Sequence, residues 1–174
     1  PRVIRHRRIK VFGAGESHVE QMLPDIIRRG RQPSVGITVH EATITLRITA
    51  AGATPEECQQ AMEPTVATIR QCLGALVFGE EDDELEDAVM RLLVERNHTL
   101  VTSEVATAGS LAKWLSRAAG IDPHYLGGSV LRSMSALKRA LGPDADVLNR
   151  GPAVREAVEL IAARERAAAD ADYA

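Results

Sequence analysis

Apolar and polar residues alternate along two neighbouring segments of the chain, residues 35–39 and 43–49. A period of two is typical of a half-buried β-strand. Because the link at 40–42 is short, the pattern predicts an antiparallel hairpin. A third strand is predicted at 7–13, where apolar residues alternate with basic ones.

Two segments of this first part have helical spacing instead. Apolar residues recur every three or four positions over 17–29, although Pro24 weakens that prediction because proline lacks the N–H of a helix interior. A second helix is predicted from Thr54 to about Leu73, with a break or kink at Pro64. Together with a closing strand near 76–78, these elements predict a small α+β module of the order β-α-β-β-α.

An acidic run at 80–87 marks the expected end of this module. The predicted domains are therefore 1–80 and 81–174. The second domain reads helix, strand, helix, strand, helix, which indicates an α/β layered fold. Its expected elements are a helix around 85–93, strands at 99–103 and 125–130, and helices at 111–118, 135–141 and 152–167.

Charge and composition restrict the function only loosely. The 174 residues carry a formal net charge of -3, so the chain as a whole gives no case for nucleic-acid binding. Basic residues gather in 1–31 and acidic residues in 80–87, which indicates either a basic interaction surface with an acidic connector or solvated segments. Cys58 and Cys72 are too far apart in a helix for a disulfide, and reduced thiols favour a cytoplasmic location. We expect no membrane span, no metal site and no cofactor.

The sharpest local feature is the segment 99–109, a strand that leads through small residues into a helix. A helix N-terminus presents free N–H groups and suits a phosphate or carboxylate. The alternative is a turn whose small residues are needed only for packing, and the residues alone leave both open.

Several short motifs resemble those of the CinA (competence/damage-inducible) family. Phe12-Gly-Ala-Gly-Glu-Ser17 resembles the opening of the family's KH-like middle module. Gly127-Gly128 and the final Ala171–Ala174 resemble its later motifs. The positions that match the family's stretch T-L-A-x-A-E-S-C-T-G-G are Thr99, Leu100, Glu104, Thr107 and Gly109. The resemblance implies a KH-like βαββα module followed by a CinA-type three-layer α/β domain, which we expect to be incomplete here because the family's domain continues after Tyr173.

The resemblance implies that the second domain is of the nicotinamide-nucleotide amidase type. Such a domain hydrolyses the carboxamide of nicotinamide mononucleotide with a serine, a lysine and a tyrosine. Here the serine position is Val105, the tyrosine position is Arg132 and the lysine position is Leu137. Because none of these side chains can act as nucleophile or base, we expect catalysis to be lost. The alternative is an active amidase in which another serine attacks and another lysine is the base; the candidates are Ser103, Ser110, Ser133, Lys113 and Lys138.

Binding could survive without catalysis. The resemblance makes Glu104, Thr107, Gly109, Gly127 and Gly128 the expected ligand-binding residues. Two alternatives stay equally open: the domain still binds a ligand, or Val105 or Arg132 fills the former substrate pocket and binding is lost. The expected partners are a nicotinamide nucleotide or related small molecule, the pyrophosphatase-like N-terminal domain of the full-length protein, and further copies of the chain that pair at an open sheet edge. Nucleic-acid binding through the KH-like module is the minority interpretation, because 16–31 contains no G-x-x-G loop.

Overall fold

The computed structural model describes the whole chain except residues 1, 119, 121 and 150–153. The chain divides into two compact units, Pro1–Ala88 and Val89–Ala174.

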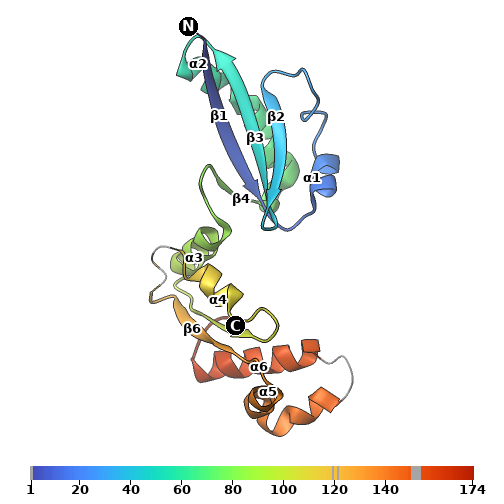
Figure 1. Ribbon diagram of the computed structural model, residues 1–174. Helices are drawn as coiled ribbons and strands as arrows, with labels where there is room; N and C mark the ends of the chain where they lie inside the picture. Colours follow the sequence, from blue (N-terminus) through green and yellow to red (C-terminus); the bar gives the residue numbers. More distant parts are fainter. Residues whose placement is uncertain (1, 119, 121, 150–153) are drawn as a thin grey trace. The chain divides into compact units, whose positions relative to one another are not determined.

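The first unit is built on a four-stranded antiparallel sheet (Figure 1). Its strands are β1 (Val3–Val11), β2 (Ser34–His40), β3 (Thr43–Gly52) and β4 (Val77–Glu80), in the spatial order β2-β3-β1-β4. The predicted hairpin is confirmed, since His40 pairs with Thr43 across the tight turn. The first strand begins earlier than predicted because Val3 already pairs with Gly52 of β3.

Two helices accompany this sheet, and both correct the sequence prediction. Helix α1 spans only Glu16–Met22 and ends before Pro24, instead of reaching residue 29. Proline has no N–H to continue the helix and disfavours helical geometry in the residue before it, which explains the early end. Helix α2 runs unbroken over Pro55–Leu73, so the predicted break at Pro64 is wrong. Pro64 is exposed on this helix.

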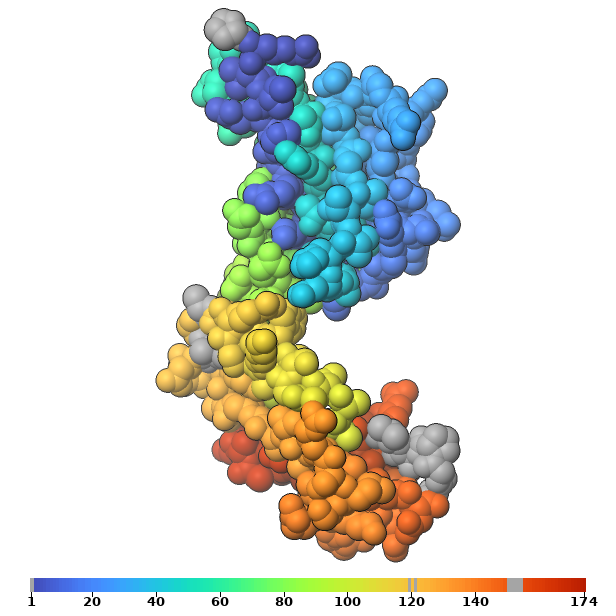
Figure 2. All heavy atoms as spheres, in the orientation of Figure 1, coloured from blue at the N-terminus to red at the C-terminus, as the bar shows by residue number. Residues whose placement is uncertain are grey.

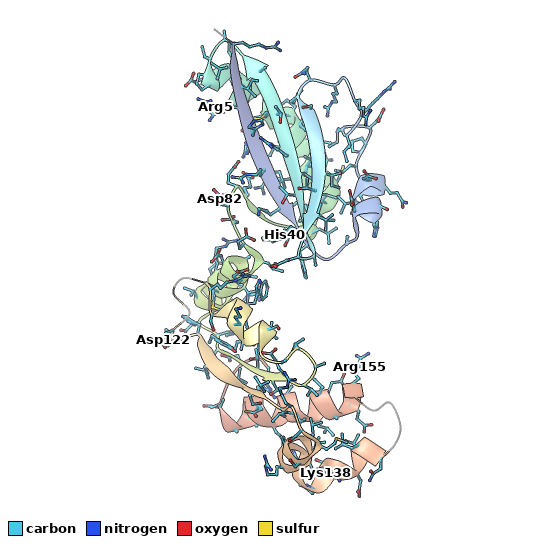
Figure 3. All side chains as sticks on the ribbon, in the orientation of Figure 1. Arg5, His40, Asp82, Asp122, Lys138 and Arg155 are labelled. Carbon is cyan, nitrogen blue, oxygen red and sulfur yellow. The ribbon has the colours of Figure 1, made fainter. Side chains whose placement is uncertain are left out.

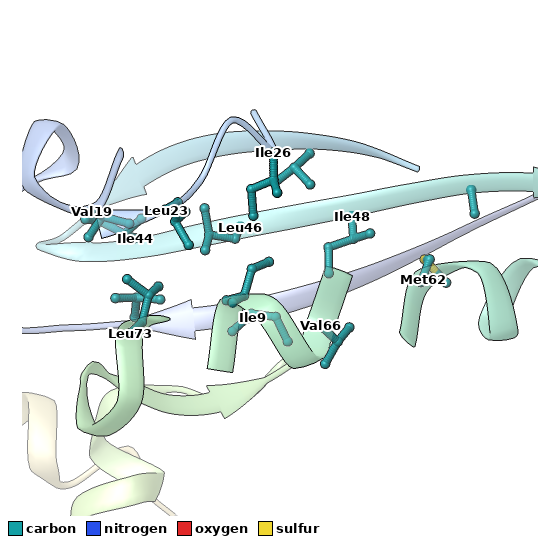
Figure 4. Close-up of a cluster of buried hydrophobic side chains, with 14 of the residues drawn as sticks. Ile9, Val19, Leu23, Ile26, Ile44, Leu46, Ile48, Met62, Val66 and Leu73 are labelled. Atoms are coloured by element: carbon teal, nitrogen blue, oxygen red, sulfur yellow. The ribbon is translucent and has the colours of Figure 1, made fainter. Parts of the chain in front are cut away.

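The core of the first unit lies between α2 and one face of the sheet (Figure 4). The strands contribute alternate residues, as a half-buried sheet requires, and α2 contributes residues three or four apart. The largest fully buried side chains include Ile9, Ile44, Leu46, Ile48, Met62 and Ile69. Thr54 caps α2 through a hydrogen bond from the Glu57 N–H to its side chain, so the predicted helix start is confirmed.

The second unit combines helices with a two-stranded parallel sheet. Strand β5 (Leu100–Glu104) pairs with β6 (Tyr125–Val130), and Leu100 also forms a parallel bridge to Tyr173. The helices are α3 (Leu85–Arg96, which begins before the division of the chain), α4 (Ser110–Leu115), α5 (Met134–Leu141) and α6 (Val154–Ala168), with a 3-10 segment at Gly142–Asn149. The part of the predicted last helix at 152–153 lies outside the described residues. An antiparallel α+β module followed by an α/β part confirms the predicted fold class.

Two small hydrophobic clusters hold the second unit together. One joins α3 to α4 and contains Met90, Leu93, Leu115 and Ala118. The other joins α5, the 3-10 segment and α6, and contains Leu141, Val147, Ala157 and Ile161. Among the described residues of the whole chain, no helix is both long and apolar enough to cross a membrane.

Candidate functional site

The turn that follows β5 is organised by one buried carboxylate, that of Glu104. This side chain ends the strand and is only 2% exposed. Its Oε2 accepts hydrogen bonds from the N–H groups of Gly109 and Leu111, each at 3.0 Å, and its Oε1 accepts one from Ala112 at 2.9 Å. A carboxylate with three backbone donors fixes the path of the chain from strand to helix.

The ionisation of Glu104 follows from these contacts. Burial by itself raises the pKa of this carboxyl group, but hydrogen bonds from the Thr107 side chain and from the amides of Ala112, Leu111 and Gly109 outweigh that effect. The net pKa of Glu104 is therefore lowered, because each donor stabilises the charged form. Thr107 thus acts on Glu104, a contact that the sequence did not reveal.

The predicted anion site at the start of α4 is changed by this arrangement. The amides of Gly109, Leu111 and Ala112 already donate to Glu104, and the Ser110 amide donates to the Thr107 carbonyl at 3.0 Å. The protein's own carboxylate occupies the place where an external phosphate was expected. Gly109 has φ +94°, a conformation that strains other residues, so it is needed for the turn.

Gly128 is explained by how closely β6 approaches β5. A Cβ at Gly128 would lie 2.5 Å from the carbonyl oxygen of Thr102, closer than real carbon atoms come. The Thr102 hydroxyl also forms a 2.7 Å hydrogen bond with Tyr125, at the start of β6. Gly128 is therefore required by strand packing, whether or not a ligand also approaches it. At Gly127 an added Cβ would meet no atom within 4 Å, and it is the φ of +106° that favours glycine there.

The three positions at which the family resemblance implies a serine, a tyrosine and a lysine come after the two parallel strands. Val105 comes directly after β5 and is half-buried, and Arg132 follows β6 and is exposed. The Leu131 N–H donates to the Glu104 carbonyl at 2.8 Å, so the strand ends lie side by side. Leu137 lies on α5, where it packs against the cluster around Leu141. Figure 3 labels the neighbouring Lys138 on the same helix.

The substitute nucleophiles have other surroundings. The Ser133 hydroxyl accepts a hydrogen bond from the Ala136 N–H and so caps α5. The Ser103 hydroxyl is buried and has no hydrogen-bond partner among the described residues, and the same holds for Ser129, which pairs with Ser103 in the sheet. Ser110 is exposed. Within the described part of the chain, no hydrogen bond joins these serines to Lys113 or Lys138.

Part of the basic segment is paired with the beginning of the acidic run. Arg7 Nε lies 3.0 Å from Glu80, and Lys10 Nζ lies 3.3 Å from Glu84. Arg8 contacts Glu81 at 3.3 Å and Asp82 at 2.9 Å. The acidic run is therefore packed along the edge of β1, instead of forming a free connector. The opposite charges of the two segments were the sequence signal for this pairing.

The two units define a class of modular protein, in which a small antiparallel α+β module precedes a unit with a parallel pair of strands and a glutamate-capped turn. The comparisons with known proteins give the particular family. Residues 6–79 match the model described as "Damage-inducible protein CinA KH domain" and residues 82–174 match the "CinA C-terminal domain". The chain belongs to the CinA family.

The chain is similar to several curated relatives, each called a putative competence-damage inducible protein. It is 34% identical over 154 residues to the protein of Clostridium beijerinckii, and covers 38% of that protein with 88% of its own length. It is 36% identical over 151 residues to the protein of Caldanaerobacter subterraneus, and covers 36% of that protein with 87% of its own length. The chain thus spans well under half the length of these relatives.

A solved structure is also similar in sequence over half of the chain. It is described as the competence-damaged protein (CinA) superfamily protein ECK1530/EC0983 of Escherichia coli. The sequence identity is 31%, the coverage is 51% of this chain and 52% of the other, and the TM-score is 0.47.

Proposed function

We propose that the second unit keeps the framework of the family's amidase-type domain but does not hydrolyse amides. It would act instead in nucleotide binding, in regulation or as a scaffold. The observation that carries this proposal is Val105, an aliphatic side chain directly after Glu104, where the family resemblance requires the attacking serine. Loss of the nucleophile in a comparable hydrolase lowers turnover by on the order of 10⁶.

The other two positions support the same conclusion. Leu137 packs among the apolar side chains near Leu141, so the position of the general base now serves the core. Arg132 is exposed at the end of β6 and replaces the tyrosine with a permanent cation. Three independent changes at one site are more consistent with abandoned chemistry than with a single tolerated substitution.

The turn itself has remained intact beside the lost residues. Glu104 still caps the turn with three backbone hydrogen bonds, and Gly128 still permits close pairing of the strands. These features support the proposal that the framework was kept after catalysis was lost; the ligand-binding role is proposed on the family resemblance. The ligand class that we propose is a nicotinamide nucleotide. By the same resemblance, we propose association with the pyrophosphatase-like N-terminal domain of the full-length protein and with further copies of the chain.

The amidase with relocated residues is less well supported. The Ser133 hydroxyl is engaged in capping α5, and that of Ser103 is buried, and among the described residues neither forms a hydrogen bond with a lysine that could accept its proton. Nucleic-acid binding is weakened in turn, because Arg7, Arg8 and Lys10 are already paired with carboxylates.

The test is a calorimetric titration of the full-length protein with nicotinamide mononucleotide and with its acid product, next to an assay of ammonia release. If the second unit binds the nucleotide, we expect heat of binding without ammonia release. If it is a scaffold, we expect neither heat of binding nor ammonia release. Ammonia release would contradict both forms. The variant Arg132→Gln separates them further, because it should weaken nucleotide binding only if the exposed cation contacts the phosphate.

A further inference from the structure

The sheet of the first unit has one face that no helix covers. Helix α2 packs on the other face and lies behind the sheet in Figure 1, so the open face is turned to the viewer in Figure 2. Arg8 of β1 and Arg47 of β3 are direct partners in the strand register, so both side chains belong to this open face. His6 and Thr49 form the next partnered position on the same face.

A basin of about 410 Å³ lies on this face and along the adjoining edge of β1. Its volume falls within the range of small-molecule sites, roughly 300–1,000 Å³. Figure 3 labels Arg5 at the edge of the sheet beside β1. The residues that line the basin are Ile4, Arg5, His6, Arg8, Arg47 and Glu81.

The positive charge of the basin is only partly neutralised. Arg8 is paired with Glu81 and Asp82. Arg47 is exposed and makes no hydrogen bond or ion pair with the described residues, and the Arg5 guanidinium donates only to the carbonyl of Ile4, at 3.2 Å. Two arginines directly opposite on neighbouring strands repel each other, so an anion between them would be stabilising.

The surrounding groups favour a phosphate over other anions. A guanidinium binds two phosphate oxygens at once, and the Arg47 guanidinium on the open face has no partner among the described residues. Arg5, the register partner of the buried Ala50, borders the basin from the edge of β1. The His6 ring, held by a 2.8 Å contact between its Nδ1 and the Thr49 hydroxyl, adds a further polar group beside them. On the far side of Arg47, the partnered residue of β2 is Gly36, which leaves the approach open.

We propose that this basin binds a small phosphate-bearing anion between Arg8 and Arg47, with His6 beside them and Arg5 at the edge of β1. The site is in the first unit and is independent of the function proposed for the second. On one side of the basin the protein already binds an anionic group of its own. The Glu81 carboxylate accepts hydrogen bonds there from the Arg8 backbone N–H and from the Arg8 guanidinium.

The test is a calorimetric titration of the purified chain with inorganic pyrophosphate. Arg47→Gln should weaken binding by about tenfold or more, because a hydrogen bond to a charged group is worth at least that factor. The matched control is Arg29→Gln, which removes one exposed positive charge from the same unit outside the basin. This control should change the affinity by less than about twofold.

A second pair of variants uses Gly36, where an added side chain meets no atom within 4 Å. Gly36→Glu places a carboxylate beside Arg47 and should compete with the anion, whereas Gly36→Gln has nearly the same size without the charge and should bind normally. Four results would overturn the proposal: no heat with pyrophosphate, equal losses in Arg47→Gln and Arg29→Gln, equal losses in the two Gly36 variants, or binding to a single-stranded oligonucleotide without binding to pyrophosphate.

Discussion

Glu104 is the residue on which the turn after β5 depends, and its charge links the stability of the second unit to pH. The folded-state pKa is lowered, so the carboxylate stabilises the unit above its ordinary pKa of about 4.3. That stabilisation disappears as the pH falls through the lower, folded-state value. Glu104→Gln should lose about 1–3 kcal/mol at neutral pH, because backbone donors are left without their charged acceptor.

The difference between the wild type and Glu104→Gln should begin to shrink near the ordinary pKa of about 4.3, because the unfolded-state carboxyl group takes up a proton there while the folded-state one stays charged. It should level off only below the lower, folded-state pKa. Urea unfolding at several pH values measures it. A difference that stays constant down to pH 2 would show that the charge of Glu104 does not contribute.

Gly128 gives a second prediction for a single residue. Gly128→Ala should destabilise the second unit by about 2 kcal/mol or more, because the new methyl group would overlap the Thr102 carbonyl and force the strands apart. Ser129→Ala is the control, since its buried hydroxyl has no partner within the described residues, and it should leave stability unchanged or slightly higher. Thermal unfolding of both variants decides the matter, and equal melting temperatures would contradict the close-packing argument.

At the level of elements, β1 and the acidic segment after β4 are joined by ion pairs of unequal value. Glu80 is 22% exposed in its side chain and accepts from both Arg7 and Arg70, and these bonds lower its pKa although burial acts in the opposite direction. Glu80→Gln should therefore cost about 1–2 kcal/mol. Asp82→Asn should cost less than about 0.5 kcal/mol, because Asp82 is 88% exposed and its pair with Arg8 is solvent-screened. Equal losses in chemical denaturation would contradict this ranking.

Most elements could be predicted from periodicity, and the exceptions have local causes. The hairpin of β2 and β3 was evident because alternation and a short turn agree. Helix α1 was predicted too long because Ile26 and Ile27 continue the apolar pattern after Pro24 has already ended the helix. Ile26 is nevertheless buried, so the pattern was right about burial and wrong about conformation.

The site was predictable only in part, for a physical reason. Motif positions such as Glu104 and Gly109 could be found from the sequence, but their mutual hydrogen bonds depend on how the turn folds back on the strand. A sequence cannot distinguish an acid that contacts a ligand from an acid that caps a helix. The pairing of Arg8 with Glu81 joins residues 73 positions apart, and opposite charge alone does not specify such a contact.

At the scale of the whole molecule, the first unit has a core of its own between α2 and the sheet. We expect a chain of residues 1–88 to fold without the second unit, because domains of this size bury enough apolar surface for independent stability. A cooperative unfolding transition with a native circular-dichroism spectrum is the expected result. A non-cooperative transition would show that the units depend on each other.

We propose that this member of the family has lost amide hydrolysis, since Val105, Arg132 and Leu137 stand where the resemblance implies the catalytic groups. The rate of ammonia release from nicotinamide mononucleotide by the full-length protein tests this. We expect no release above the uncatalysed background, for the wild type and for Val105→Ser alike, because positions 132 and 137 also lack the implied catalytic groups. Turnover by the wild type at an ordinary enzymatic rate, roughly 1 s⁻¹ or faster, would contradict it.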